Sequence, residues 1–126
     1  MADSDIRRYE ARAASTAVFG RVMCSVRSHH FVVDGPEQNG CPGEEVTPGE
    51  LFLSAVASCG VELIQVLAKS DGVPLRGVEV EITGTMDRSN PVRSDVSLFN
   101  SVRLRFQLQG VTDEDGRKLV EKFKGR

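Results

Sequence analysis

One stretch of the chain, residues 47–70, is apolar on nearly every side when it is drawn as a helix. A helix of this kind is expected to be buried on most sides. Its start is marked by Thr47, which suits the N-cap, by Pro48 at the first helical position, and by Glu50, which completes a capping box. Gly72 is a typical residue just beyond a helix end. The pattern therefore predicts a long central helix over residues 47–70.

Shorter runs on both sides of this helix alternate between apolar and polar residues, as half-buried strands do. These runs cover residues 6–17, 18–27 and 30–34 before the helix, and residues 78–86 and 96–108 after it. Thr112 begins a second helical pattern, with acidic residues in its first turn and basic residues in its last. The order β-β-β-α-β-β-α, with strands in hairpin-like succession, predicts an α+β fold. In that fold a mainly antiparallel sheet packs on the long central helix.

The length of 126 residues is that of one domain, which we expect to span residues 1–126. The central helix is more apolar than one sheet face in a small monomer requires. Its remaining sides are therefore expected to be covered by a second copy of the chain, in an intertwined homodimer.

Charge and polarity exclude several kinds of partner. The formal net charge is −2, which gives no electrostatic reason to expect nucleic acid. Polar residues interrupt the central helix at positions 50, 54, 58, 62 and 65, so it is not expected to span a membrane. The first ten residues lack the apolar segment of a secretory leader.

The cysteines and histidines are the next candidates for chemistry. Cys24, Cys41 and Cys59 are odd in number and irregular in spacing, which fits free thiols in a reducing cytoplasm better than a disulfide framework. No Cys/His spacing matches a zinc site, and neither a metal nor another cofactor is expected. His29 and His30 are adjacent on a predicted strand, so at most one of them faces a site. On residue type alone, Cys59 on an apolar helix is most often a small core residue. Cys24, on an alternating strand, is expected to be a core residue, whereas Cys41, in a loop rich in Gly and Pro, is expected to be exposed.

Three segments of the sequence, HHFVVDGP, TPGELFLSAVASC and GVPLRGVEVEITG, resemble the OsmC/Ohr family of osmotically inducible and organic hydroperoxide resistance proteins. The resemblance covers roughly residues 20–124, and the chain resembles a divergent member. It implies an intertwined dimer with two thiol sites between the subunits. It further implies a thiol-dependent peroxidase that reduces organic hydroperoxides or hydrogen peroxide, through a sulfenic acid and then a disulfide to a second cysteine. By this resemblance, Cys59 takes the reactive position.

The chain departs from the hydroperoxide-reducing members of the family in several places. Their helix-start glutamate lies ten residues before the reactive cysteine, where this chain has Gly49. Glu50 is one position later, about half a turn from Cys59 around the helix, so we expect it to serve as a cap rather than as a partner of the thiol. The family's second cysteine follows the second long helix. This chain ends near that point at Arg126, so it is either naturally short or an incomplete copy of a longer protein.

Peroxide reduction needs a thiolate, which an unperturbed cysteine largely lacks at neutral pH. Cys59 is too far from the helix start to be helped by the helix dipole, so a cation has to stabilise the thiolate. By the resemblance this cation is an arginine near the first hairpin, for which Arg21 and Arg27 are both candidates. Glu62, on the face of Cys59, would disfavour the thiolate by itself but could orient an arginine that bridges the two. The predicted catalytic residues are Cys59, Arg21 and Glu62.

Two functional hypotheses remain open from the sequence, together with a third, a scaffold without a small-molecule site. The first is hydroperoxide reduction at Cys59, with an external low-molecular-weight thiol or Cys41 resolving the sulfenic acid. The second is a non-catalytic dimer of the same fold that holds an apolar small molecule in an interface pocket. In each case the expected partner is a second copy of the chain, and the peroxidase hypothesis adds a hydroperoxide and a thiol reductant.

Overall fold

A computed structural model describes residues 5–125 of the chain, and these residues form two compact units that divide between Leu51 and Phe52. Residues 1–4 and Arg126, which the predicted single domain includes, lie outside the described part. The division falls in the first turns of the central helix, and we describe each unit by itself. That residues 1–126 form a single domain stays a prediction.

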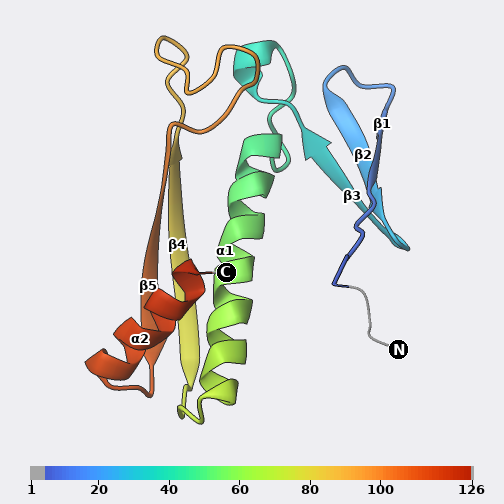
Figure 1. Cartoon of the computed structure of the whole chain (residues 1–126). Coiled ribbons are helices and arrows are strands. Elements are labelled where there is room, and N and C mark those ends of the chain that lie inside the picture. Colours follow the sequence, from blue (N-terminus) through green and yellow to red (C-terminus); the bar gives the residue numbers. More distant parts are fainter. Residues whose placement is uncertain (1–4, 126) are drawn as a thin grey trace. The chain divides into compact units, whose positions relative to one another are not determined.

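The elements follow the predicted order (Figure 1). They are β1 (Arg12–Ser15), β2 (Arg21–Val26), β3 (His29–Asp34), a short 3-10 turn (Glu37–Asn39), α1 (Pro48–Ser70), β4 (Gly77–Thr85), β5 (Ser101–Gln109) and α2 (Asp113–Lys124). Each strand pair within residues 5–125 is antiparallel, so the α+β prediction is confirmed. The strands form two separate sheets, β1-β2-β3 and β4-β5, where the sequence pattern predicted a single sheet.

The first unit is built on the β1-β2-β3 sheet. Strands β2 and β3 are joined by a two-residue turn in which Arg27 adopts a φ of 54°, the left-handed conformation that such turns require. The register places Arg21 opposite Asp34 and Ser25 opposite His30. Because partners in an antiparallel pair share a face, this register decides which side chains of the two strands meet.

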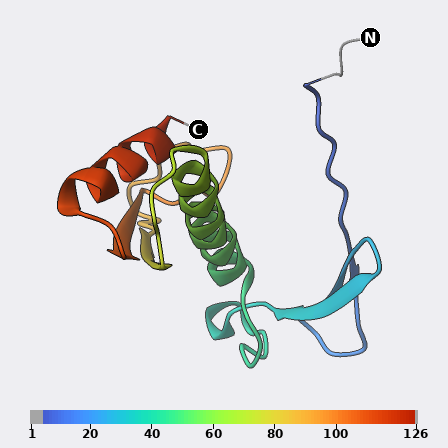
Figure 2. The ribbon, with the colours of Figure 1, turned by 90° about the horizontal axis from the view of Figure 1, so that it is seen from below.

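The second unit is a β4-β5 hairpin with both helices on one face (Figures 1 and 2). Its core consists of Ile64, Leu67 and Ala68 from α1 together with Leu119 from α2. Phe106 and Leu108 of β5 pack against this cluster. The alternate residues of the hairpin are polar and point away from the helices, as the period of a half-buried strand requires.

The ends of α1 are formed as predicted. The backbone N–H of Thr47 donates to Glu50 Oε1 over 3.0 Å, and the Thr47 hydroxyl donates to the same oxygen over 2.9 Å. These bonds confirm that Glu50 is a capping residue. At the other end Gly72 has a φ of 68°, and the N–H of Val73 donates to the carbonyl of Ala68.

The second unit buries only one side of α1, so the burial of its other sides by a second copy of the chain stays a prediction. Gly60, Ile64 and Leu67 on that side are buried, whereas Phe52 and Val66 on another side are 54% and 47% exposed. The helix is also long and apolar enough to cross a membrane by length and composition alone, and the expectation that it does not span one stays a prediction. A single helix of this kind is weak evidence, since the core helix of a soluble protein meets the same criterion.

The segment between β4 and β5, residues 86–100, is longer than predicted, because β5 begins at Ser101 rather than at Val96. Asn100 explains this start. Its side-chain oxygen accepts from the N–H of Asp87 and its amide group donates to the carbonyl of Asn90, each over 2.7 Å, while its own N–H donates to Thr85. A side chain that bonds to nearby backbone groups in this way holds the chain out of the strand pairing.

Candidate functional site

Cys59 lies in the middle of α1 and is an exposed free thiol. Residues spaced three or four apart on a helix share a face. On this rule Cys59 belongs to a stripe with Phe52, Ala55, Glu62 and Val66, all of which are exposed. Within the described residues Cys59 is therefore not a core residue, which was the alternative expected from its residue type. The thiol instead lies on the side of α1 that the second unit leaves open.

Glu62, the predicted orienting group, lies one turn after Cys59 on the same stripe and is exposed. Between residues 5 and 125 it makes no ion pair or side-chain hydrogen bond. The carboxylate is thus unpaired in this part of the chain, and its predicted role of orienting an arginine stays a prediction.

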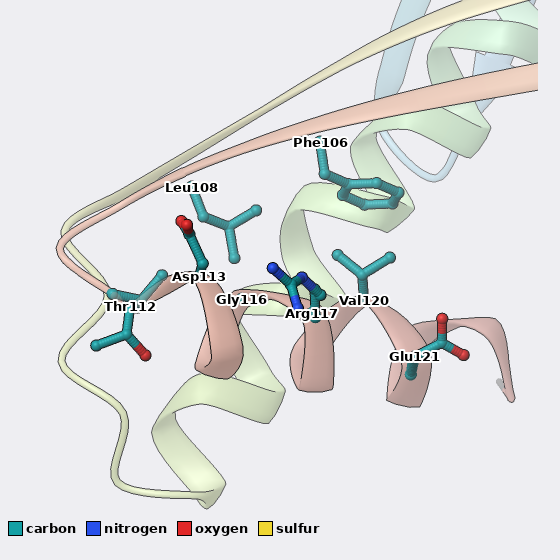
Figure 3. Close-up of a pocket in the computed structure, with 9 residues that line it drawn as sticks. Phe106, Leu108, Thr112, Asp113, Gly116, Arg117, Val120 and Glu121 are labelled. Atoms are coloured by element: carbon teal, nitrogen blue, oxygen red, sulfur yellow. The ribbon is translucent and has the colours of Figure 1, made fainter.

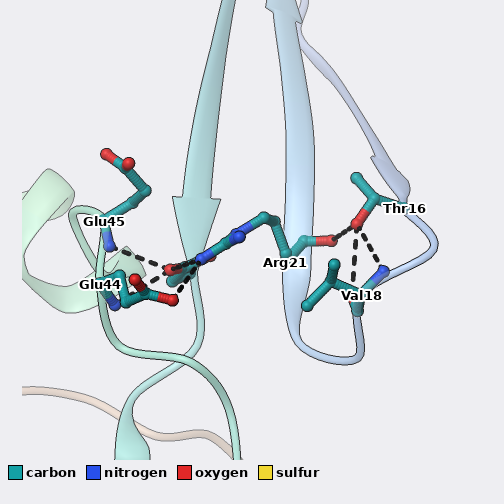
Figure 4. Close-up of polar contacts among 6 residues, drawn as sticks. Thr16, Val18, Arg21, Glu44 and Glu45 are labelled. Carbon is teal, nitrogen blue, oxygen red and sulfur yellow. Dashed lines mark hydrogen bonds and ion pairs between the residues drawn. The ribbon is translucent and has the colours of Figure 1, made fainter.

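Arg21, at the start of β2, is the most strongly bound of the predicted site residues (Figure 4). Its Nε donates to Asp34 Oδ1 over 2.8 Å and its Nη2 donates to Asp34 Oδ2 over 2.9 Å, the two-pronged geometry of an arginine–carboxylate pair. Nη2 also donates to Glu44 Oε1 over 3.2 Å. The Asp34 side chain is fully buried, whereas that of Arg21 is 28% exposed.

The loop that leads into α1 completes this cluster. The backbone N–H groups of Glu44 and Glu45, both labelled in Figure 4, donate to Asp34 Oδ2 over 3.0 Å and 2.9 Å. The hydrogen bonds from Arg21, and then those from the backbone, hold the pKa of Asp34 well below its usual range, although burial acts in the opposite direction. The same bonds to Asp34 and Glu44 raise the pKa of Arg21 further above its already high value. Both groups are therefore charged at neutral pH.

Asp34 was not identified from the sequence, where it only ended a short β-branched strand before Gly35-Pro36. The signal that could have found it is a charged residue directly after the apolar run Phe31–Val33. A charge in that position is buried only when it is paired. Arg21 was the available partner, but the register that joins them depends on the turn at Arg27.

The other candidates lie elsewhere in the first unit. Arg27, the alternative to Arg21, is at the exposed tip of the β2–β3 turn. Cys41, which we expected to be exposed, is half-buried, because its sulfur packs against the backbone of Gly20 and Gly35, and a Cβ at either glycine would collide with it. Cys24, predicted to be a core residue, is likewise half-buried.

The three predicted catalytic residues fall in different units. Arg21 belongs to residues 1–51, whereas Cys59 and Glu62 belong to residues 52–126. The structure brings Cys59 and Glu62 onto one face of α1, and it brings Arg21 together with Asp34 and Glu44. That Arg21 serves the thiol of Cys59 stays a prediction.

A separate hollow of about 410 Å³ lies between β5 and α2 (Figure 3). Its apolar lining comes from Phe106, Leu108, Val111 and Val120, and Asp113, Arg117 and Glu121 add charged groups. None of the three cysteines lines it. Within residues 5–125 no group of three or more His, Cys, Asp or Glu side chains could hold a metal ion.

Comparison with known proteins gives a consistent result. The family profile of OsmC-like proteins matches residues 41–126, whereas no curated protein sequence matches the chain. Among solved structures, an OsmC-like protein from Mycoplasma pneumoniae has a TM-score of 0.79 at 13% identity, with 95% of this chain and 82% of that chain covered.

Two further structures carry a name that describes a function. An organic hydroperoxide resistance protein OsmC from Legionella pneumophila has a TM-score of 0.72 at 18% identity, with 94% of this chain and 83% of that chain covered. An organic hydroperoxide resistance protein from Elizabethkingia anophelis, with thiocyanate bound, has a TM-score of 0.68 at 18% identity and covers 95% and 83%. At these identities the likeness shows the fold.

Proposed function

The chain belongs to the family of OsmC-like proteins, and from this membership we propose that it reduces organic hydroperoxides with the thiol of Cys59. The observation that carries the proposal is the exposure of this thiol. Cys59 lies inside the segment that matches the family, on the long helix, and is not enclosed by its own unit. An accessible thiol is what a bulky hydroperoxide requires.

The proposed reaction is an attack of the Cys59 thiolate on the terminal oxygen of the hydroperoxide. A sulfur–oxygen bond forms, the oxygen–oxygen bond breaks, and the rest of the substrate leaves as an alcohol after it takes up a proton. The sulfur is oxidised to a sulfenic acid and the hydroperoxide is reduced. A thiol then condenses with the sulfenic acid to give a disulfide and water, and a further thiol releases Cys59.

Arg21 and Glu62 are proposed to assist the thiol, Arg21 by stabilising the thiolate and Glu62 by orienting the arginine. An external low-molecular-weight thiol is proposed to resolve the sulfenic acid. Cys41 is the weaker choice for this step, because packing against Gly20 and Gly35 leaves its sulfur little room to move.

The functional unit is proposed to be an intertwined homodimer in the cytoplasm. The exposed apolar stripe of α1, with Phe52 and Val66, supports the dimer because a second copy would cover it. Thiol chemistry that needs a reducing partner supports the cytoplasm.

The test is to treat the reduced protein with a small excess of cumene hydroperoxide and to locate oxidation by mass spectrometry. We expect Cys59 to gain one oxygen or a thiol adduct within seconds to minutes, and the Cys59→Ser variant to consume no hydroperoxide. The matched controls are Cys24→Ser and Cys41→Ser, which are expected to retain the reaction. An unmodified Cys59 after prolonged treatment would refute the proposal.

A second candidate function, the binding of an apolar small molecule without catalysis, is favoured by the hollow between β5 and α2. Its lining is largely apolar, and Arg117 is accompanied there by the carboxylates of Asp113 and Glu121, a combination suited to an uncharged apolar ligand. Saturable binding of an uncharged apolar fluorescent probe that is lost in Val120→Asp and retained in Cys59→Ser would support this function. Binding lost in neither variant would exclude this hollow as the site.

A further inference from the structure

A row of polar side chains crosses the β1-β2-β3 sheet close to the β2–β3 turn. In the register of this sheet Arg12 on β1 lies opposite Ser25 on β2, and Ser25 lies opposite His30 on β3. Partners in antiparallel strands share a face, so these three side chains are neighbours on one face of the first unit. His29, which precedes His30 in the sequence, belongs to the other face.

The hydroxyl group in this row is hydrogen-bonded to the imidazole. Ser25 Oγ and His30 Nδ1 lie 2.8 Å apart. When Nδ1 carries a proton, it donates to Oγ, and the hydroxyl hydrogen is then free to donate to a further group. His30 can thus prepare Ser25 as a donor without contacting that group itself.

A second hollow, of about 350 Å³, adjoins this row, and we call it the β1–β2 hollow. It is lined by Glu10, Ala11, Arg12, Ser25 and Arg27, all of which belong to the first unit. With respect to the part of the chain that the structure describes, neither arginine has an ion pair or a side-chain hydrogen bond. Two guanidinium groups and one carboxylate give the lining a net positive charge. The hollow therefore offers unused, charged donors to an anion.

Arg27 reaches this hollow from a backbone conformation that is costly for an arginine. Its φ of 54° lies in the left-handed region, where a Cβ crowds the backbone and where Gly or Asn is preferred in a two-residue turn. A glycine would form the same turn without this cost. A strained residue of this kind points to a use of its side chain, and the β1–β2 hollow is where the Arg27 side chain lies.

We propose that the β1–β2 hollow binds the phosphate group of a small phosphate ester that carries hydroxyl groups. Arg12, Ser25 and Arg27 donate from β1, from β2 and from the turn. Donors on several sides suit the three terminal oxygens of a phosphate ester better than the two oxygens of a carboxylate, which one guanidinium satisfies. The volume lies within the range of small-molecule sites, so the rest of the ester has room as well.

Glu10 determines what the rest of the ester has to be. An ionised carboxylate only accepts hydrogen bonds and repels a phosphate, so Glu10 accepts from a hydroxyl group of the ester instead. The inference is independent of the proposed function, because it uses no residue of the second unit.

The test follows the two histidines of the chain by NMR while glycerol 3-phosphate is added to the nitrogen-15-labelled protein. Sodium chloride keeps the ionic strength constant, so that general screening does not change. We expect a saturable change at His30, with the Nδ1 signal moving toward that of a protonated nitrogen, and a much smaller change at His29. No saturable change at His30, or an equal change at His29, would overturn the inference.

Two other anions identify the chemical class of the ligand. Methyl phosphate has no hydroxyl group on its organic part, so we expect it to bind about three- to tenfold more weakly than glycerol 3-phosphate. Acetate is expected to bind at least about tenfold more weakly, because it has fewer oxygens to accept from the lining. Equal affinity for acetate would overturn the phosphate site, and equal affinity for methyl phosphate would overturn the role of Glu10.

A matched pair of variants tests whether the site or the overall charge binds the anion. Arg12→Gln should weaken the binding of glycerol 3-phosphate by at least about tenfold, because charged hydrogen bonds are lost. Arg103→Gln removes the same charge from the polar face of β5 and should leave the affinity unchanged. Equal losses in the two variants would overturn the inference.

Arg27→Asn separates binding from folding. Asn suits a left-handed turn position better than Arg, so the urea midpoint of this variant should stay at or above the wild-type value. The affinity for glycerol 3-phosphate should nevertheless fall by at least about tenfold. Retained affinity, or a loss of affinity that comes with a lower urea midpoint, would overturn the role of Arg27.

Discussion

At the scale of single residues, Asp34 combines full burial with a charge. Both of its oxygens accept hydrogen bonds, from Arg21 and from two backbone N–H groups of the following loop. Replacing water by this many donors is what allows a carboxylate to stay ionised inside a protein. The cluster ties β2, β3 and the loop before α1 together, so its charge state affects the whole first unit.

The stability of the protein should therefore depend on pH in the acid range. The pKa of Asp34 is depressed in the folded state, so its contribution is fully present above its unfolded pKa of about 4 and is lost as the pH falls toward the folded value. Urea midpoints measured at a series of pH values should fall steeply below about pH 4 in the wild type. In Asp34→Asn the midpoints should be lower at neutral pH and should fall less. Parallel curves for the two proteins would contradict this assignment.

Two glycines with different surroundings give a second test at this scale. A Cβ at Gly60 in α1 would lie 3.5 Å from Phe106 and Val80, which is ordinary contact, so Gly60→Ala should stabilise the protein by about 0.5–1 kcal/mol. A Cβ at Gly84 in β4 would lie 2.8 Å from the ring of Phe99, so Gly84→Ala should destabilise it by about 1–3 kcal/mol. Urea denaturation measures both, and a change of the same sign in both would contradict the packing of the second unit.

At the scale of elements, α1 is the clearest case of a structure specified by local sequence. Thr47, Glu50 and Gly72 marked both ends, and the observed helix begins and ends where they predict. The order of the strands could also be predicted from the sequence. The start of β5 could not, because Val96 and Leu98 continue the apolar–polar alternation, whereas the side chain of Asn100 bonds to the backbone of residues 87 and 90 and keeps this part of the chain out of the strand. The alternation of apolar and polar residues indicates which side chains can pack on a sheet, but it does not show hydrogen bonds from a side chain to the backbone that compete with strand pairing.

The position of the capping box at the start of α1 predicts that a change there affects the stability of the protein but not the reaction of Cys59. Thr47→Ala removes the cap and should lower the free energy of unfolding by about 1 kcal/mol. Cys59 is on the opposite side of the helix from Glu50 and several turns away, so the rate of its oxidation should stay at the wild-type value. Chemical denaturation and the hydroperoxide assay measure the two quantities on the same sample. A parallel loss of both would mean that the helix start belongs to the thiol site.

At the scale of the whole molecule, the sequence predicted the family fold and the long helix better than it predicted which residues meet at the candidate site. Cys59 could be singled out because it follows the segment TPGELFLSAVAS, and Arg21 because it lies near the first hairpin. Asp34 could not, because its pairing depends on a strand register that a non-glycine residue, Arg27, fixes by adopting a positive φ. The pairing of two side chains far apart in the sequence cannot be predicted from a local pattern of apolar and polar residues.

The exposed stripe of α1 leads to a prediction about assembly. Val66, which is 47% exposed, would be covered in the proposed dimer, so Val66→Glu should bury an unpaired charge there. We expect self-association to weaken by at least about tenfold in sedimentation velocity. Gln107→Glu, which adds the same charge to the polar face of β5, should leave it unchanged. A wild-type protein that sediments as a monomer at all concentrations would exclude the dimer.

The hydrogen bonds of Asn100 have a consequence for protein engineering. The Asn100 side chain bonds to the backbone of residues 87 and 90, and its own N–H bonds to Thr85. These bonds join the end of β4 to the start of β5, so the rest of the connecting segment is not needed to hold the two strands together. The chain between residues 91 and 97 can then be cut or lengthened without unfastening β4 from β5. This short stretch is accordingly the place to insert an epitope or a fluorescent reporter.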